Sequence, residues 1–331
     1  MDNQIDPKNA PILVPSPTDQ NSVRVFPEEW KTPIRLTDLS QVSAKRDIDL
    51  EYRIIRVLAE DERMNKRLFR SDDSKDKNRY RDMVPFSDNR VVLPDGSYIN
   101  ASYMVNGDGT NRKAFIASQG PLKSTIADQW TMIHNEAVFS ILTIGKLTEG
   151  PTEKIALYWP ENVGDVLEIG VVRVECSSVS EIAPGFFKRI LWLSLHGGSK
   201  KEINHFHYVA WPDHGSITCE TMILLASVVK GERSAHPSSP MLIHCSAGVG
   251  RTGTVLAIAN CIESVDKQLK ESGGDLSECW LSVMTTVLNL RECRVHIVER
   301  TWQYQSIYDA IVELVKQHAN GTLELLPLRQ W

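Results

Sequence analysis

The sequence lacks two features of membrane and exported proteins. Although 42% of its 331 residues are hydrophobic, no stretch approaches the roughly 18 consecutive apolar residues of a membrane-spanning helix. Residues 1–6 lack the basic and then apolar order of a secretory signal peptide. We therefore expect no membrane span, and a chain long enough for one large core or two modest domains.

An excess of positive charge and paired cysteines are also missing. The net charge of -5 gives no basic field that would attract nucleic acid or an anionic membrane. The six cysteines contain no Cys-x-x-Cys pair, so their spacing predicts neither a disulfide framework nor a zinc site. His205 and His207 alternate on an expected strand without a third ligand in view, so metal binding is not expected. These absences favour a cytoplasmic protein, in whose reducing surroundings a reactive thiolate persists.

The most informative stretch covers residues 241–254. Its first residues are apolar and predict a short buried strand, and the residues after it have apolar side chains at helical spacing. Between them lies a loop with three glycines, Gly248, Gly250 and Gly253, which leave backbone N–H groups unobstructed. Such groups at the positive end of a helix dipole bind a dianion well. The stretch therefore predicts a phosphate-binding loop between a strand and a helix.

Cys245 opens this loop and Arg251 closes it. The field that attracts phosphate also stabilises a thiolate, so we expect Cys245 to be a charged nucleophile at neutral pH. Arg251 can hold two phosphate oxygens with parallel hydrogen bonds. A lone Cys-x5-Arg also arises from a buried cysteine and an unrelated arginine. Here the glycine-rich loop supplies the context that attack by sulfur on phosphorus needs.

The loop resembles the signature of the cysteine-dependent, tyrosine-specific protein phosphatases, His-Cys-Ser-x-Gly-x-Gly-Arg-Ser/Thr-Gly. Further segments resemble this family, in its order, over residues 45–315. The resemblance implies a non-receptor enzyme with a single catalytic α/β domain, a highly twisted mixed β-sheet flanked by α-helices. The implied reaction is hydrolysis of phosphotyrosine in proteins through a cysteinyl-phosphate intermediate, with no cofactor or metal. The implied partners are phosphotyrosine-containing proteins, and the sequence leaves the oligomeric state open.

The resemblance also assigns roles within the phosphate-binding loop. The N–H groups of the loop would bind the phosphate oxygens, and the residues concerned are Ser246, Ala247, Gly248, Val249 and Gly250. Thr252 would donate a hydrogen bond to the sulfur as it leaves the phosphorus. His244 precedes the nucleophile on the buried strand and is expected to support the loop from behind.

Two other segments resemble loops that line the substrate cleft. Residues 77–86 match the phosphotyrosine-recognition loop, in which Tyr80 would stack on the substrate ring and Asp82 would accept hydrogen bonds from the substrate backbone. Residues 149–160 match the family's Glu-x4-Lys-x3-Tyr-Trp-Pro segment. By that match Glu149 would orient the catalytic arginine and Lys154 would approach the acid loop. The alternative for both is an ordinary solvated charge.

A third segment, Trp211-Pro212-Asp213, resembles the mobile acid loop of the family. Departure of a phenolate needs a proton, which a positioned carboxylic acid supplies, and the resulting carboxylate can then activate water. Asp213 is the candidate for both tasks. The family has an aromatic residue after this aspartate, whereas this chain has His214. We expect His214 either to pack less well on the ring or to make loop closure sensitive to pH.

The last segment, residues 290–304, resembles the loop that positions the hydrolytic water. The family has Gln-x-x-x-Gln there, and this chain has Glu299 and Gln303. A glutamate still accepts a hydrogen bond from water, but it adds negative charge beside a phosphate. We therefore expect slow dephosphorylation of the enzyme without loss of the first step.

Periodicity and turn residues predict the remaining elements. Helices are expected over residues 44–68, from Thr125 onward, and over 219–230, 275–290 and 301–315. Strands are expected over residues 97–103, 114–117, 138–144, 165–176, 187–195 and 202–209. We expect a flexible tail over residues 1–25, the catalytic domain over 26–318 and a second tail over 319–331.

Two alternatives stay open. The departures at His214 and Glu299 are compatible with a module that binds phosphotyrosine and barely turns it over. A second alternative keeps the enzyme but changes its substrate to phosphoserine, phosphothreonine or a phosphoinositide. The segment around Tyr80 disfavours this second alternative, since a deep cleft admits only the longer tyrosine ester.

Overall fold

The structure is a computed structural model that describes residues 13–15, 23–25, 32–60, 62–212 and 215–319. Most of residues 1–25, the first predicted tail, lie outside these ranges, as do residues 320–331 of the second predicted tail. Asp213 and His214 also lie outside them. Within residues 1–25, β1 (Leu13–Pro15) pairs antiparallel with β2 (Val23–Val25). The predicted domain boundaries stay predictions.

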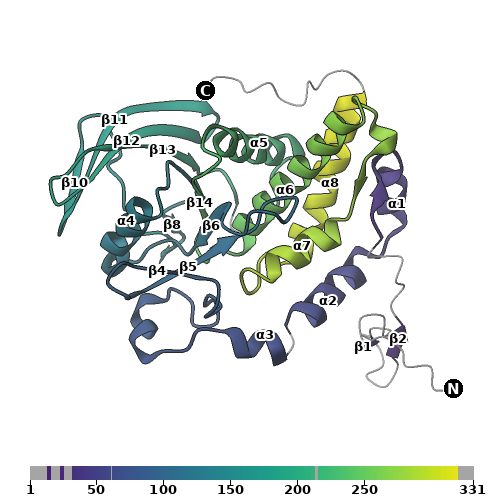
Figure 1. Ribbon diagram of the computed structural model, residues 1–331, viewed down its shortest axis with the longest axis horizontal. Helices are drawn as coiled ribbons and strands as arrows, with labels where there is room; N and C mark the ends of the chain where they lie inside the picture. Colours follow the sequence, from purple (N-terminus) through teal and green to yellow (C-terminus); the bar gives the residue numbers. More distant parts are fainter. Residues whose placement is uncertain (1–12, 16–22, 26–31, 61, 213–214, 320–331) are drawn as a thin grey trace.

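A nine-stranded mixed sheet carries the fold, in the order β10-β11-β12-β13-β7-β14-β6-β5-β4 (Figure 1). Its strands are β4 (Arg90–Val92), β5 (Tyr98–Met104), β6 (Phe115–Ser118), β7 (Ser140–Ile144), β10 (Val166–Ile169), β11 (Val172–Ala183), β12 (Phe186–Leu195), β13 (Lys201–Tyr208) and β14 (Met241–His244). Strand β14 runs parallel to both neighbours, β6 and β7, and β7 also runs parallel to β13, whereas the remaining pairs of the sheet are antiparallel. The predicted fold class, a mixed sheet flanked by helices, is confirmed.

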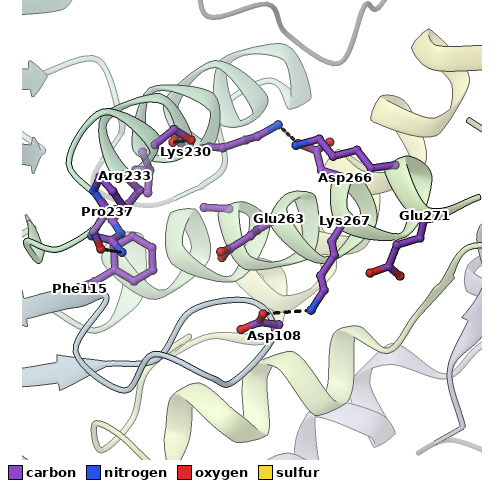
Figure 2. Close-up of a pocket in the computed structure, with 13 residues that line it drawn as sticks. Asp108, Phe115, Lys230, Arg233, Pro237, Glu263, Asp266, Lys267 and Glu271 are labelled. Carbon is purple, nitrogen blue, oxygen red and sulfur yellow. Dashed lines mark hydrogen bonds and ion pairs between the residues drawn. The ribbon is translucent and has the colours of Figure 1, made fainter. Parts of the chain in front are cut away.

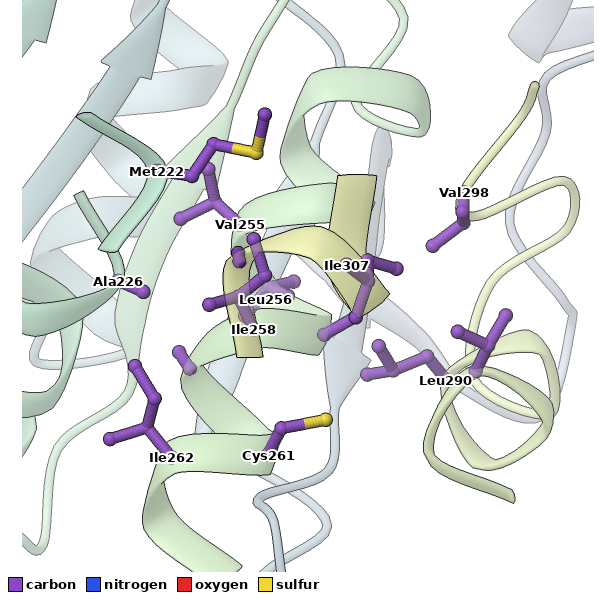
Figure 3. Packing of buried hydrophobic residues seen from close by; sticks show 14 of the residues in the cluster. Met222, Ala226, Val255, Leu256, Ile258, Cys261, Ile262, Leu290, Val298 and Ile307 are labelled. Atoms are coloured by element: carbon purple, nitrogen blue, oxygen red, sulfur yellow. The ribbon is translucent and has the colours of Figure 1, made fainter. Parts of the chain in front are cut away.

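Helices cover both faces of this sheet. They are α1 (Leu39–Lys45), α2 (Ile48–Ala59), α3 (Glu62–Arg67), α4 (Ile126–Asn135), α5 (Cys219–Ala235), α6 (Gly250–Glu271), α7 (Val283–Arg291) and α8 (Thr301–Ala319). The larger core lies between the sheet and α5–α8, and a smaller one lies under α4 on the opposite face (Figures 1 and 3). Met241 and Ile243 belong to the larger core and Leu242 to the smaller one, as strand alternation requires.

The predicted helix after the phosphate-binding loop is confirmed as α6. Its expected apolar face is buried throughout and comprises Val255, Ile258, Ile262, Val265 and Leu269. Figure 3 shows this face packed among side chains of α5, α8 and the segment near Val298. The hairpin β5–β6, the strands β7, β12 and β13, and helices α5 and α8 also follow the predictions. Helix α5 ends at Ala235, later than expected.

Three predicted elements are divided in the structure. The single helix expected over residues 44–68 is wrong, because α1, α2 and α3 replace it and Asp47 caps a new start by accepting a hydrogen bond from the Leu50 N–H (2.9 Å). The strand expected over 165–176 turns back at Gly170, whose φ is 57°. The helix expected over 275–290 begins only with α7, after a 3-10 turn (Leu276–Glu278) and β15 (Trp280–Leu281).

Two short sheets complete the architecture. β15 pairs with β3 (Ile34–Arg35), and β8 (Thr148–Glu149) pairs with β9 (Thr152–Glu153) in a hairpin that carries Glu149. Among the residues that the structure describes, no helix is long and apolar enough to cross a membrane. In the same part of the chain, no cluster of three or more His, Cys, Asp or Glu side chains could hold a metal ion.

Candidate active site

The phosphate-binding loop connects the end of β14 with the start of α6. Cys245 follows the strand and is only 4% exposed, and the loop turns through Gly248, whose φ is 70°. A Cβ at Gly248 would overlap the carbonyl oxygen of Ser118. Two features therefore require glycine at position 248, namely the positive φ of the backbone and the close approach of the loop to β6.

Arg251 lies in the first turn of α6, where it contacts Glu149 and the backbone of Pro212. Its Nη2 lies 2.7 Å from Oε1 of Glu149, and both side chains are nearly buried. The same nitrogen donates a hydrogen bond to the carbonyl oxygen of Pro212 (3.0 Å). Lys154 lies 3.5 Å from the other oxygen of Glu149. The predicted meeting of Glu149 and Arg251 is confirmed as a contact, whereas an approach of Lys154 to the acid loop stays a prediction.

A cavity of about 600 Å³ opens over the loop. Its walls contain ten of the predicted site residues, which are Tyr80, Glu149, Lys154, Cys245, Ser246, Ala247, Gly250, Arg251, Glu299 and Gln303. Met83, Arg300 and Trp302 also line it and were not predicted. The structure thus brings segments that are more than 200 residues apart in the chain, from Tyr80 to Gln303, around the cavity that Cys245 lines.

Four predicted residues lie elsewhere. Gly248, Val249 and Thr252 are buried and do not line the cavity, and the Thr252 hydroxyl has no hydrogen-bond partner among the residues described. Asp82 is exposed and lines a neighbouring groove of about 1090 Å³ with Arg81 and His296. The general-acid candidate Asp213 lies outside the described residues.

Tyr80 joins the recognition segment to the phosphate-binding loop. Its hydroxyl lies 2.9 Å from Oγ of Ser246, and that Oγ donates to the carbonyl oxygen of Lys154 (3.0 Å). The phenol ring is therefore fixed as one wall of the cavity above the nucleophile's neighbour. Such a wall suits an aromatic substrate ring, which stacks well on a tyrosine.

His244 lies behind the nucleophile and is fully buried. Its Nε2 lies 2.7 Å from the Tyr158 hydroxyl and 2.9 Å from Oγ1 of Thr143, and its Nδ1 lies 3.1 Å from the Cys245 carbonyl oxygen. Burial lowers the pKa of His244 to about 4, so the imidazole is neutral at physiological pH. This geometry fits the expected support of the loop from behind.

Arg294 is a site residue that the sequence analysis missed. It is fully buried and donates to the carbonyl oxygens of Gly248 (2.9 Å) and Ala247 (3.1 Å). Because the C=O and N–H of a trans peptide point in opposite directions, binding these carbonyls leaves the following N–H groups turned away from Arg294. Burial lowers the pKa of Arg294 to about 10, which leaves it charged at neutral pH. Nothing in the sequence of residues 290–304 distinguished this arginine from its neighbours.

Glu299 and Gln303 lie against the start of α6. The Gln303 Oε1 accepts hydrogen bonds from the backbone N–H groups of Glu299 (2.9 Å) and Arg300 (3.1 Å), which fixes the side chain at the beginning of α8. A Cβ on Gly250 would lie 2.6 Å from Nε2 of Gln303 and 3.3 Å from Oε2 of Glu299. Both predicted water-positioning side chains are thus close to the phosphate-binding loop.

The other five cysteines differ from Cys245. All are free thiols, none lines the cavity above the loop, and burial raises the pKa of each one. For Cys261 the pKa is raised to about 12. These five sulfurs therefore stay protonated at neutral pH, as buried structural thiols do.

A second cavity, of about 500 Å³, lies between α5 and α6 (Figure 2). Its most prominent charges are already paired, Lys230 with Asp266 and Lys267 with Asp108. None of the predicted site residues that the structure describes lines it. Ten of the predicted site residues line the cavity above Cys245 instead.

Comparisons with known proteins agree with this geometry. A sequence profile described as protein-tyrosine phosphatase matches residues 74–313. The rat tyrosine-protein phosphatase non-receptor type 20 is 31% identical over 245 residues, 73% of this chain and 55% of that protein. The mouse tyrosine-protein phosphatase non-receptor type 9 is 31% identical over 94% of this chain and 54% of that protein. This chain therefore spans about half the length of these relatives.

A receptor-type relative and a solved structure are also similar. The human receptor-type tyrosine-protein phosphatase alpha is 32% identical over 72% of this chain and 29% of that protein. The catalytic domain of human protein tyrosine phosphatase non-receptor type 18 superposes with a TM-score of 0.74 at 22% identity, covering 85% of this chain and all of that one. The profile and these identities place this chain in the protein-tyrosine phosphatase family.

Proposed function

We propose that this chain hydrolyses phosphotyrosine in proteins through a phosphate bound to Cys245. The observation that carries the proposal is the arrangement of one cysteine, a loop of glycines and an arginine oriented by a buried carboxylate, all around one cavity. Loop N–H groups and the Arg251 guanidinium supply positive charge where negative charge develops on the phosphate oxygens. No metal is needed for that task.

The first step transfers the phosphoryl group to sulfur. The Cys245 thiolate attacks phosphorus, the bond between phosphorus and the tyrosine oxygen breaks, and Asp213 gives its proton to the departing phenolate. The contact between Arg251 and the Pro212 carbonyl supports this assignment, because Asp213 is the next residue along the chain.

The second step releases phosphate. A water held near Gln303 and Glu299 gives a proton to the Asp213 carboxylate and attacks phosphorus, and the bond between phosphorus and sulfur breaks. Thr252 donates a hydrogen bond to the leaving thiolate. The positions of Gln303 and Glu299 beside Gly250 support this assignment.

The substrate class follows from the wall of the cavity. Tyr80 suits an aromatic phosphate ester. Asp82 is exposed and can contact the peptide that carries the phosphotyrosine. The non-receptor type 18 phosphatase, whose fold this chain shares, has been solved with phosphotyrosine peptides.

A cytoplasmic location is also proposed for this chain, because six free cysteines suit a reducing compartment. We propose residues 26–318 as the catalytic unit.

The decisive experiment looks for phosphorus on the nucleophile. A phosphotyrosine peptide is mixed with the protein, quenched within milliseconds and digested, and the Cys245 peptide is examined for phosphate. We expect a phosphocysteine in the wild type and none in Cys245→Ser, which should lose turnover and still bind phosphate. A wild type that releases phosphate without ever carrying it on Cys245 contradicts the mechanism.

Matched peptides separate the open alternatives. Phosphotyrosine, phosphoserine and phosphothreonine in one peptide context, and a phosphoinositide, are compared for phosphate release. Preference for the tyrosine ester supports the proposal. Tight binding of the phosphotyrosine peptide without release would instead favour a binding module.

A further inference from the structure

Helix α2 contacts the segment that carries Glu299 and Gln303 at several points. Figure 1 shows α2 beside α7 and α8, and it packs against both. The helix lies outside residues 74–313, the part of the chain that the phosphatase profile matches. We propose that Glu51, Tyr52 and Glu60, on α2 and at its end, are positioning residues for the hydrolytic step. This inference rests on the proposed function.

The first contact fixes the residue before Glu299. The Tyr52 hydroxyl donates to the Val298 carbonyl oxygen (2.9 Å), and Nη2 of Arg291 donates to the same oxygen (2.8 Å). Val298 has a φ of 58°, a left-handed conformation that is unfavourable for a β-branched residue. Surrounding contacts must therefore hold this backbone, and two hydrogen bonds to its carbonyl do so.

The second contact fixes the residue after Gln303. Glu51 is fully buried, and its Oε1 accepts hydrogen bonds from the hydroxyls of Tyr304 (3.0 Å) and Tyr308 (3.1 Å). Its charge is balanced by Arg46, whose Nη1 lies 3.2 Å away. Tyr304 lies in the first turn of α8, so this carboxylate determines where that turn sits relative to the cavity.

The third contact holds the beginning of the same segment. The Oε1 of Glu60 lies 2.8 Å from Nη1 of Arg291, which is almost fully buried, and 3.2 Å from Nδ1 of His296. His296 also has a positive φ, of 57°. Contacts from α2 and its end therefore hold residues on both sides of Glu299 along the chain. Val298 itself packs in the larger core with Leu290 and Ile307 (Figure 3).

These contacts act on one step more than on the other. The segment also contacts the phosphate-binding loop, through Arg294 and through the Val298 N–H, which donates to the Val249 carbonyl oxygen (3.1 Å). The residues that α2 holds nevertheless adjoin Glu299 and Gln303, whereas Arg251 is oriented by Glu149 from the β8–β9 hairpin. Hydrolysis depends on the placement of a single water, and small displacements of positioning groups cost rate. Weakening the contacts from α2 should therefore slow the loss of phosphate from Cys245 and leave the formation of the phosphocysteine unchanged.

The test measures both steps directly. Rapid-quench experiments with an aryl phosphate follow the formation and the decay of phosphocysteine in wild type, Tyr52→Phe and Glu51→Gln. Ile311→Val is the control, because it removes one buried methylene from α8 at a comparable cost in stability without touching the polar contacts. We expect decay to slow about fivefold in Tyr52→Phe, as for one lost hydrogen bond, with formation unchanged within twofold.

The outcomes separate this inference from the proposed function. If Glu51→Gln fails to fold, Tyr52→Phe and Tyr304→Phe supply the same measurement. Equal slowing of both steps, or decay as fast as in Ile311→Val, overturns the positioning role while phosphocysteine still forms. A wild type that never carries phosphate on Cys245 overturns the proposed function itself, and this inference with it.

Discussion

The Glu149 carboxylate and the Arg251 guanidinium form an ion pair of 2.7 Å that is almost entirely shielded from water. Glu149 comes from the small β8–β9 hairpin, which is not part of the nine-stranded sheet. Arg251 belongs to α6, the helix that follows β14. The hairpin therefore decides in which direction the arginine presents its donors.

Removing this carboxylate should weaken catalysis more than it weakens the fold. In Glu149→Gln the neutral amide no longer fixes the guanidinium by charge. We expect kcat/KM for a phosphotyrosine peptide to fall about 10- to 100-fold, in line with the loss of one shielded charge contact. Glu153→Gln, in the same hairpin but more exposed, is the matched control. Similar losses in both variants would show that the hairpin acts only by folding.

Asp213→Ala should separate binding from turnover. Loss of a general acid costs roughly 10²- to 10⁴-fold in rate, and the thiolate and arginine that hold the phosphate remain. We expect kcat to fall in that range while KM stays within a fewfold, so that the variant retains phosphotyrosine proteins in a pull-down. Competition by vanadate serves as the control for site occupancy. Full activity of the variant would rule out the assignment.

Glu299→Gln should accelerate the reaction. The glutamate carries negative charge close to the start of α6 and so opposes attack on a phosphorylated cysteine. We expect a steady-state rate up to roughly tenfold higher, with the burst of phenol release unchanged. An unaltered steady-state rate would mean that this charge does not limit dephosphorylation.

The buried histidines make the fold sensitive to acid. Burial lowers the pKa of His207 and of His244 to about 4, whereas an exposed histidine titrates near 6.5. Between these pH values the unfolded chain binds more protons than the folded one, so the free energy of unfolding falls as the pH drops from about 7 toward 4. Each histidine contributes about 3 kcal/mol over the whole interval.

Guanidinium unfolding at pH 7.5, 6 and 5 measures this dependence. The variant His207→Gln is a useful control, because its amide can still donate to the Gly145 carbonyl oxygen, which lies 2.9 Å from Nε2 of His207. We expect the pH dependence of stability to become shallower in that variant. A wild-type stability that is constant or higher at pH 5 would contradict the argument.

The central strand, the loop and α6 could be predicted from sequence because local signals agree there. Apolar residues end at His244, glycines follow, and a helical pattern starts at once, so each level points to the same geometry. The contact between Glu149 and Arg251 was accessible only through resemblance, since no local rule relates residues 102 positions apart.

The failures have physical causes as well. Residues 44–68 have one continuous helical period, but Asp47 offers the backbone a cap that begins a new helix. Gly170 reverses a strand whose apolar alternation continues on both sides of it. Arg294 could not be recognised, because a buried arginine is identified by the carbonyls that surround it and not by its neighbours in sequence.

The contrast among the six sulfurs has a practical consequence for chemical biology. Burial raises the pKa of five thiols, while the sixth, Cys245, lines the same cavity as Arg251. Under the proposed mechanism, a small alkylating reagent at neutral pH should modify Cys245 ahead of the other five cysteines. Mass-spectrometric footprinting of intact cells with such a reagent would report the occupancy of this one position.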